Sequence, residues 1–116
     1  MHEHHRALQI FQEAEKYVQE AGSDCVSEIQ ITLGKDSGLM PENISLYFET
    51  ISDGTICEGA KLIFNLVTPL LRCRTCGKLF ERKPFSFACD GENCTGEGEP
   101  TEIGKEFFIE SVLVKT

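Results

Sequence analysis

The feature that most constrains this chain is a cluster of four cysteines with the spacing Cys73-x2-Cys76, then twelve residues, then Cys89-x4-Cys94. Each pair brings two thiolates around a tight turn onto one ion. Two such turns facing each other complete the closed tetrahedral site that is typical of structural zinc. Because four thiolates leave no open position for water, we expect the zinc to fold this segment and to do no chemistry.

The alternative for these cysteines is a pair of disulfides or four unconnected thiols. The N-terminal sequence MHEHHRALQIFQEAEK is interrupted by acidic residues where a signal peptide would be apolar. No apolar run approaches the roughly 20 residues that are needed to cross a bilayer. We therefore expect a soluble, cytoplasmic protein with no membrane partner. Disulfides are rare in that reducing compartment, which favours zinc.

The other two cysteines, Cys25 and Cys57, lie apart from the cluster and beside the apolar residues Val26 and Ile56. We expect both to be buried as small apolar side chains rather than to bind metal, because free cysteine is among the most buried residue types. The phenylalanines between the two cysteine turns are expected to form the small apolar core of the zinc-binding segment. They are Phe80, Phe85 and Phe87.

Hydrophobic periodicity outside the cluster predicts two helices and three strands. Apolar residues at spacings of three and four predict a helix over 6–21, and a second helical pattern begins at Pro41 and continues to Ile51. Alternation predicts a strand over 28–33, and apolar runs predict strands over 62–67 and 107–114. The apolar faces consist of Ala7, Ile10, Phe11, Ala14, Tyr17, Val18, Ala21, Ile29, Ile31, Leu33, Ile44, Tyr47, Phe48, Ile51, Leu62, Phe64 and Leu66.

The chain enters the cysteine segment from one predicted strand and leaves it into another. We therefore predict an α+β fold: a small mixed α/β body, with about two helices on a three-stranded sheet, that carries an inserted zinc-binding module. The predicted body comprises residues 1–71 and 100–116, and the predicted module comprises residues 72–99.

Charge limits the classes of partner. The chain has 11 Lys and Arg against 19 Asp and Glu, a formal charge of −8, which opposes non-specific attachment to nucleic acid or anionic lipid. The first part of the module is locally basic, so a zinc-ribbon adaptor for nucleic acid or protein stays open as an alternative function. Its basic residues are Arg72, Arg74, Lys78, Arg82 and Lys83.

A second candidate metal site is the N-terminal sequence Met1-His2-Glu3. A free α-amine, the amide nitrogen of His2 and its imidazole form fused five- and six-membered chelate rings, and the amide of Glu3 is placed to contribute. Nitrogen donors around a flat site suit square-planar Ni(II) or Cu(II). The alternative is that His2 is a solvated terminal residue, because chain ends are usually loose.

Together these motifs resemble the HypA family, the nickel metallochaperones of [NiFe]-hydrogenase maturation. The resemblance covers essentially all 116 residues. It rests on Met1-His2-Glu3, the strand 29–33 with Gly34, the stretch Asp53-Gly54-Thr55-Ile56-Cys57-Glu58-Gly59-Ala60, the zinc cysteines and the closing strand 104–114.

The resemblance implies a metal carrier and not an enzyme. Ni(II) would be held transiently at the N-terminus and delivered, with a HypB-type GTPase, to the large subunit of a [NiFe]-hydrogenase, while Zn(II) would be structural. The implied fold is a small mixed α/β domain with a zinc module before its last strand. The implied ligands are Met1, His2 and Glu3 for nickel, and Cys73, Cys76, Cys89 and Cys94 for zinc.

Some positions depart from the family pattern. The second cysteine pair is usually Cys-x2-Cys, whereas four residues separate Cys89 from Cys94, and Lys35 stands where Glu is common. Positions 4 and 5, usually an apolar and a small residue, are both histidine. His4 and His5 are either extra nickel donors, with His5 one helical turn from His2, or solvated residues at a helix start.

Overall fold

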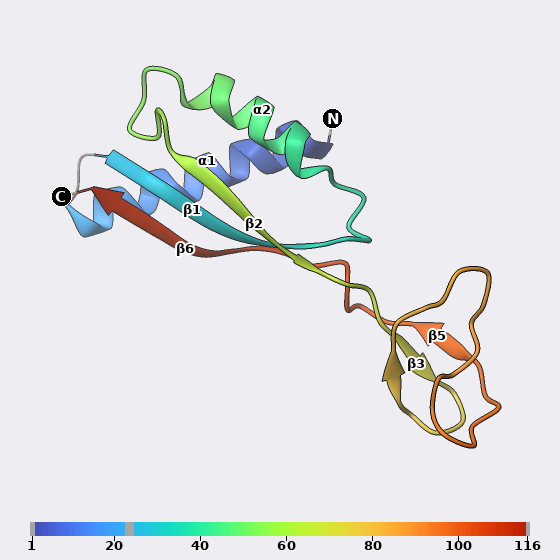
Figure 1. Cartoon of the computed structure of the whole chain (residues 1–116). Helices are drawn as coiled ribbons and strands as arrows, with labels where there is room; N and C mark the ends of the chain where they lie inside the picture. The colour runs from blue at the N-terminus through green and yellow to red at the C-terminus, as the bar shows by residue number, and fades with distance from the viewer. Residues whose placement is uncertain (1, 23–24, 116) are drawn as a thin grey trace.

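The computed structural model describes residues 2–22 and 25–115 and shows an elongated molecule of 57 × 27 × 16 Å (Figure 1). Two helices and a three-stranded sheet form its larger part, and a second, smaller sheet lies beyond one end. This arrangement confirms the predicted α+β class. The elements are α1 (His2–Ala21), β1 (Cys25–Gly34), α2 (Pro41–Ser52), β2 (Lys61–Val67), β3 (Leu71–Cys73), β4 (Leu79–Phe80), β5 (Gly98–Pro100) and β6 (Phe107–Lys115).

The larger sheet has the strand order β2-β1-β6, so β1 is its central strand. Strand β1 runs parallel to β2 and antiparallel to β6. A parallel pair needs a long crossover connection, and α2 lies within that connection. Both helices lie on the same face of the sheet (Figure 1). The three strands predicted for the body are therefore confirmed.

One apolar core lies between the helices and this sheet. Ile29 and Ile31 of the central strand are fully buried and pack against both helices. Six of the helical positions that the spacings of three and four predict to be apolar are buried. These positions are Ala7, Ile10, Ala14, Val18, Ile44 and Phe48.

Four residues that the sequence pattern places on the apolar faces are exposed instead. Tyr17 and Tyr47 are 45% and 36% exposed, because a phenol at the margin of a stripe can cover apolar neighbours and keep its hydroxyl in water. Ala21 is exposed in the last turn of α1. Leu66 is 52% exposed because it lies near the end of β2, past the residues of that strand that pack on the core.

Helix α1 begins at His2, four residues earlier than the apolar pattern predicted. The added turn contains Glu3, and a negative charge is favourable there because the helix macrodipole is positive at its N-terminus. Residues 2–5 contain no apolar side chain, so a hydrophobic period could not detect this turn. His2 is therefore part of a helix.

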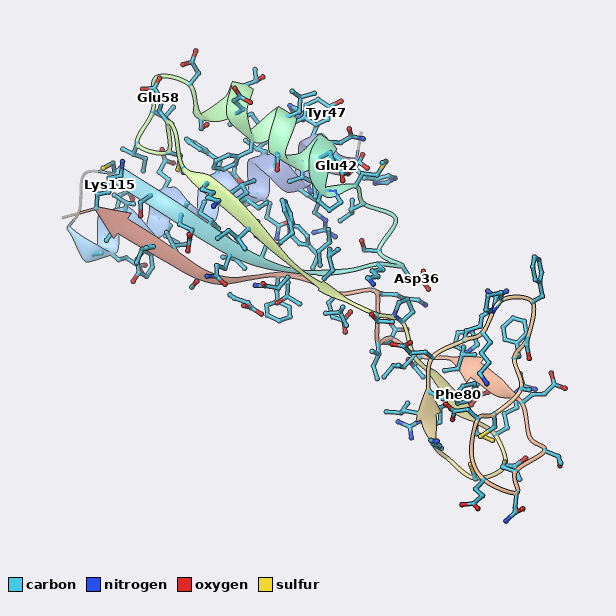
Figure 2. The ribbon with its side chains drawn as sticks, in the orientation of Figure 1. Asp36, Glu42, Tyr47, Glu58, Phe80 and Lys115 are labelled. Carbon is cyan, nitrogen blue, oxygen red and sulfur yellow. The ribbon has the colours of Figure 1, made fainter. Side chains whose placement is uncertain are left out.

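The module contributes an antiparallel sheet of its own, with the order β4-β3-β5, which the sequence pattern did not predict. Its strands are two or three residues long, too short to show an alternating pattern. The sheet begins at Leu71 and ends at Pro100, and the boundaries at 72 and 99 remain a prediction. Figure 2 shows the labelled Phe80 within this part of the molecule, apart from the core of the body.

The prediction that three phenylalanines form the core of the module is wrong for two of them. Phe80 is 3% exposed, but Phe85 is fully exposed and Phe87 is 43% exposed. The guanidinium of Arg82 lies 4.6 Å from the ring centroid of Phe87. The Phe80 ring lies so close to Gly98 that a Cβ atom there would be 2.5 Å from it. The module is small and organised around its four cysteines, so it buries only one of the three phenylalanine rings, that of Phe80.

Body and module are joined where two glycines approach each other. The amide of Gly34 donates to the carbonyl of Glu106 at 2.8 Å. The carbonyl of Gly104 accepts a hydrogen bond from the amide of Asp36 at 2.7 Å. A Cβ atom on Gly34 would lie 2.0 Å from the carbonyl oxygen of Gly104, which is itself at φ +106°. The backbones can approach this closely only because both residues lack a side chain.

Replacing Gly34 by alanine is expected to lower the free energy of unfolding by about 2–4 kcal/mol, because the new methyl group meets backbone atoms that cannot rotate away. Urea unfolding followed by helical circular dichroism measures the loss. Gly54→Ala is the control, since it has positive φ but open space around it and should cost about 1 kcal/mol. Equal losses in the two variants would contradict the close approach.

Helix α1 has 20 residues, but its buried residues recur only once per turn and the rest of its surface is largely polar. Neither this helix nor any other within residues 2–22 and 25–115 combines the length and the apolar character that crossing a membrane requires.

Candidate metal centres

Four sulfur atoms converge in the module. The Sγ atoms of Cys73, Cys76, Cys89 and Cys94 all lie within 4.8 Å of one another. The Sγ atoms of Cys73 and Cys94 are 3.6 Å apart, and those of Cys76 and Cys89 are 3.7 Å apart. Over the described part of the chain, this is the one group of three or more His, Cys, Asp or Glu ligands that converges. The fold thus brings together all four residues that the spacing singled out.

These sulfur distances suit a tetrahedral zinc ion. With Zn–S bonds of about 2.3 Å, the sulfurs of a regular tetrahedron are about 3.8 Å apart. The separations of 3.6 and 3.7 Å are close to that value. They are far longer than the roughly 2.05 Å of a disulfide, and the cysteines are free thiols. Four thiolates at this spacing would enclose the ion without an open position, as structural sites do.

Backbone amides support the sulfurs in both turns. The amides of Thr75 and Cys76 donate to Cys73 Sγ at 3.4 and 3.5 Å. In the second turn, the amide of Gly91 donates to Cys89 Sγ at 3.2 Å. Amide dipoles that point at sulfur stabilise the thiolate, which is the form that binds a metal.

The second turn has two more residues between its cysteines than the first, yet its sulfurs reach the same centre. The amide of Cys94 donates to the carbonyl of Gly91 at 3.2 Å, and Asn93 has φ +62°. Asparagine is one of the few side chains that adopt this left-handed conformation readily. The four-residue spacing is therefore compatible with chelation in this chain.

The thiols of the cluster differ in acidity. Hydrogen bonds from the amides of Cys76 and Thr75 lower the pKa of Cys73 to about 6. The amide of Gly91 lowers the pKa of Cys89, but burial and the neighbouring thiols outweigh it and raise that pKa to about 12.

The basic residues behind the alternative function are partly neutralised. Lys78 Nζ lies 2.8 Å from a carboxylate oxygen of Asp90, and the pair raises the pKa of Lys78 and lowers that of Asp90. Arg74 Nε lies 3.3 Å from a carboxylate oxygen of Glu99. Each pairing cancels a charge that binding to phosphate would need. This geometry disfavours the module as a nucleic-acid surface.

At the N-terminus, His2 is exposed in the first turn of α1, and the predicted ligand Met1 lies outside the described residues. The first four amides of a helix have no acceptor within the helix. The His2 amide belongs to this group. A metal can therefore use its nitrogen without breaking a hydrogen bond of the helical ladder.

The Glu3 carboxylate connects the beginnings of the two helices. Its Oε2 accepts a hydrogen bond at 3.3 Å from the amide of Met40, which directly precedes the first residue of α2. Amide hydrogen bonds from Glu3 itself and from Met40 hold the pKa of this carboxyl below its usual range. The contact joins residues that are 37 positions apart, so no local motif could have predicted it.

The other two N-terminal histidines have different surroundings. The His4 ring meets the Tyr47 ring of α2 edge to face, with centroids 5.2 Å apart. His5 is exposed. The side chains of His2, His4 and His5 do not converge as a ligand group within the described residues. A nickel-binding role for His4 or His5 stays a prediction.

The two separate cysteines belong to the body. Cys57 is fully buried, and burial raises the pKa of its thiol to about 11, as expected for a small core residue. Cys25, the first residue of β1, is partly buried. Neither belongs to the convergent cysteine group.

Comparison with known proteins gives a consistent result. Residues 1–114 match a family model described as hydrogenase/urease nickel incorporation, metallochaperone, HypA. A protein of Caldanaerobacter subterraneus subsp. tengcongensis, named hydrogenase maturation factor HypA, is 36% identical over 91 residues, which cover 78% of each chain. A protein of the same name from Aquifex aeolicus is 27% identical over 112 residues, 97% of this chain and 96% of the other.

Two solved structures share the fold. The solution structure of the Ni metallochaperone HypA from Helicobacter pylori aligns with a TM-score of 0.62 at 17% identity and covers 97% of this chain and 96% of that one. A solution structure of HypA protein aligns with a TM-score of 0.65 at 15% identity and covers 94% and 92% of the two chains. At these identities the likeness concerns the arrangement of helices, sheets and module.

Proposed function

The chain belongs to the HypA family, and from this premise we propose that it binds Ni(II) transiently at its N-terminus and passes it on during hydrogenase maturation. The observation that carries the proposal is the family match over residues 1–114, which includes His2 exposed in the first helical turn. Nickel is then a cargo that enters and leaves unchanged. The protein is proposed to be a carrier and not an enzyme.

The proposed nickel donors are the amine of Met1, the amide and imidazole of His2, and the amide of Glu3. Nitrogen donors in one plane suit Ni(II). Because the donors lie at a chain end, they can leave the metal one at a time, which a caged site would not permit. The Glu3 carboxylate already accepts a hydrogen bond from the amide of Met40, which supports a role for the backbone of Glu3 rather than its side chain.

The four-cysteine site is proposed to hold structural Zn(II). When bound, the metal would cross-link the two cysteine turns and so fold the module. Its proposed ligands are Cys73, Cys76, Cys89 and Cys94, and their sulfur spacing supports the assignment. Nickel transfer uses the N-terminus of the chain and needs no chemistry from the zinc.

The nickel site can be tested by changing only the chain terminus. An N-terminal extension turns the amine into an amide and moves the chelate rings off the terminus, so an N-terminal tag is expected to impair nickel binding. A C-terminal tag is the matched control and should have no effect. Zinc analysis and calorimetric titration with Ni(II) are expected to give one zinc per untagged chain and one added nickel. Equal nickel affinities in the two tagged forms would place the site elsewhere.

The proposed partners are a HypB-type GTPase and the large subunit of a [NiFe]-hydrogenase. A metal relay needs donor and acceptor ligands to approach closely, so the GTPase is expected to contact the first part of α1. Shift mapping by NMR with the purified GTPase should perturb residues 2–20 and leave the module unaffected. Shifts confined to residues 72–99 would count against this arrangement.

A further inference from the structure

The segment between β4 and β5 carries an aromatic ring that the fold does not use. Phe85 is fully exposed, although phenylalanine is among the residues most often buried. Figure 1 shows this part of the chain, drawn in gold, extending beyond the short strands of the module. Neither the zinc site nor the nickel site involves this ring.

A specific turn places the ring at the tip. The amide of Ser86 donates to the carbonyl of Lys83 at 3.1 Å, with Pro84 and Phe85 as the two central residues. Phe85 has φ +58°. Proline followed by a residue with positive φ is the pattern of a type II turn, whose second central residue is usually glycine. Phe85 therefore occupies a position whose backbone conformation is unstrained for glycine but strained for a residue with a side chain.

The base of this loop is held on the module. The carbonyl of Phe87 accepts a hydrogen bond from the amide of Gly98 at 2.7 Å, and Ala88 pairs with Glu97 in an isolated bridge. The guanidinium of Arg82 stacks over the Phe87 ring. These contacts support the two sides of the loop, so the exposed ring is presented by a fixed base.

The tip combines the ring with positive charge. Arg82 and Lys83 precede it, and within the described residues neither forms a salt bridge. Together with Pro84 and Phe85 they line a shallow hollow of 360 Å³. A complementary protein surface needs an apolar pocket for the ring and carboxylates around it for the two cations.

We propose that residues 82–87 form a docking tip that inserts Phe85 into an apolar, acid-rimmed pocket on the protein that receives the nickel, the hydrogenase large subunit. The identity of the receiver rests on the proposed function. A contact in the module leaves the N-terminal donors uncovered, so nickel can leave them while the two proteins stay attached. One aromatic anchor in a pocket can supply much of the affinity of an interface.

Phe85→Gly separates docking from folding. Glycine suits φ +58°, so the variant is expected to keep its zinc and nickel stoichiometries and to unfold near the wild-type temperature. Its affinity for the purified large-subunit precursor, measured by calorimetry, is expected to fall at least about tenfold. Phe108→Ala removes a different exposed ring, on β6, and should bind like the wild type. Lys83→Glu should weaken the complex too, because it reverses a charge of the tip.

Phe85→Gly that binds the large-subunit precursor as tightly as the wild type would overturn the inference. Loss of affinity for the GTPase, with unchanged affinity for the large subunit, would also overturn it. So would binding of the wild-type protein to duplex DNA with a steep salt dependence that the Phe85→Gly variant lacks. Nickel titration of the same samples keeps the proposals apart. Wild-type protein that binds no nickel contradicts the proposed function, whereas intact nickel binding with unchanged docking in Phe85→Gly contradicts only the docking tip.

Discussion

Replacing His2 by alanine is expected to abolish specific nickel binding while fold, zinc content and stability stay nearly unchanged. The imidazole closes the six-membered chelate ring, and no other side chain is among the proposed donors. Because His2 is exposed in the first turn of α1, its removal should change the free energy of unfolding by no more than about 0.5 kcal/mol. Calorimetric titration with Ni(II), together with the absorbance of square-planar nickel, measures the loss.

His4→Ala and His5→Ala are the matched controls, since they remove imidazoles from the same helical turn. Both should bind nickel like the wild type if the donors are the terminal amine, the backbone amides and His2. If His4 and His5 are also donors, His2→Ala will lose only part of its affinity and the two controls will each lose some. Wild-type affinity in His2→Ala would show that the nickel site lies elsewhere.

Cys73→Ala is expected to release the zinc and unfold the module while the body keeps its helices. Structural zinc sites contribute on the order of 10 kcal/mol to folding. The module has little else to hold it together, since its buried apolar cluster consists of Leu71, Cys73 and Phe80. The body has a separate core between its helices and sheet.

Metal analysis gives the zinc content of this variant, and helical circular dichroism reports on the body. Cys25→Ser and Cys57→Ser are the controls, because both cysteines lie outside the convergent cluster. They should retain one zinc per chain, although Cys57→Ser places a hydroxyl in the core and should lower stability. A wild-type protein without zinc, or controls that lose it as readily as Cys73→Ala, would refute the four-cysteine assignment.

The body could be predicted because its elements are long enough to show a period. Ile29 and Ile31 alternate with polar residues, and Ala7, Ile10 and Ala14 recur at helical spacing. The cysteine cluster could be predicted for a different reason, since metal geometry restricts ligand spacing directly. In both cases the information lies within a short stretch of sequence.

What the sequence did not reveal depends on residues far apart in the chain or on single turns. The contact between Glu3 and Met40 and the approach of Gly34 to Gly104 exist only once the fold is complete. The prediction that Phe85 lies in the core of the module rests on its position between the two cysteine turns. Pro84 favours a turn beside Phe85, but a proline alone does not say whether the next side chain points inward.

The position of the module within the chain would couple the two proposed metal sites through the conformational entropy of the chain. Strand β6 joins the body only after the chain has returned from β2 through residues 68–106. When the module is folded, it acts as a short link between β2 and β6. When the module is unfolded, the flexible loop between these strands is roughly tenfold longer, and closing that loop costs about 2 kcal/mol more in conformational entropy. The first residue of β6, Phe107, lies under the guanidinium of Arg6, 4.6 Å from its ring centroid. Zinc bound at the proposed four-cysteine site would therefore shorten the tether that keeps β6 against the first turns of α1, where nickel is proposed to bind, although no ligand of one metal needs to touch the other.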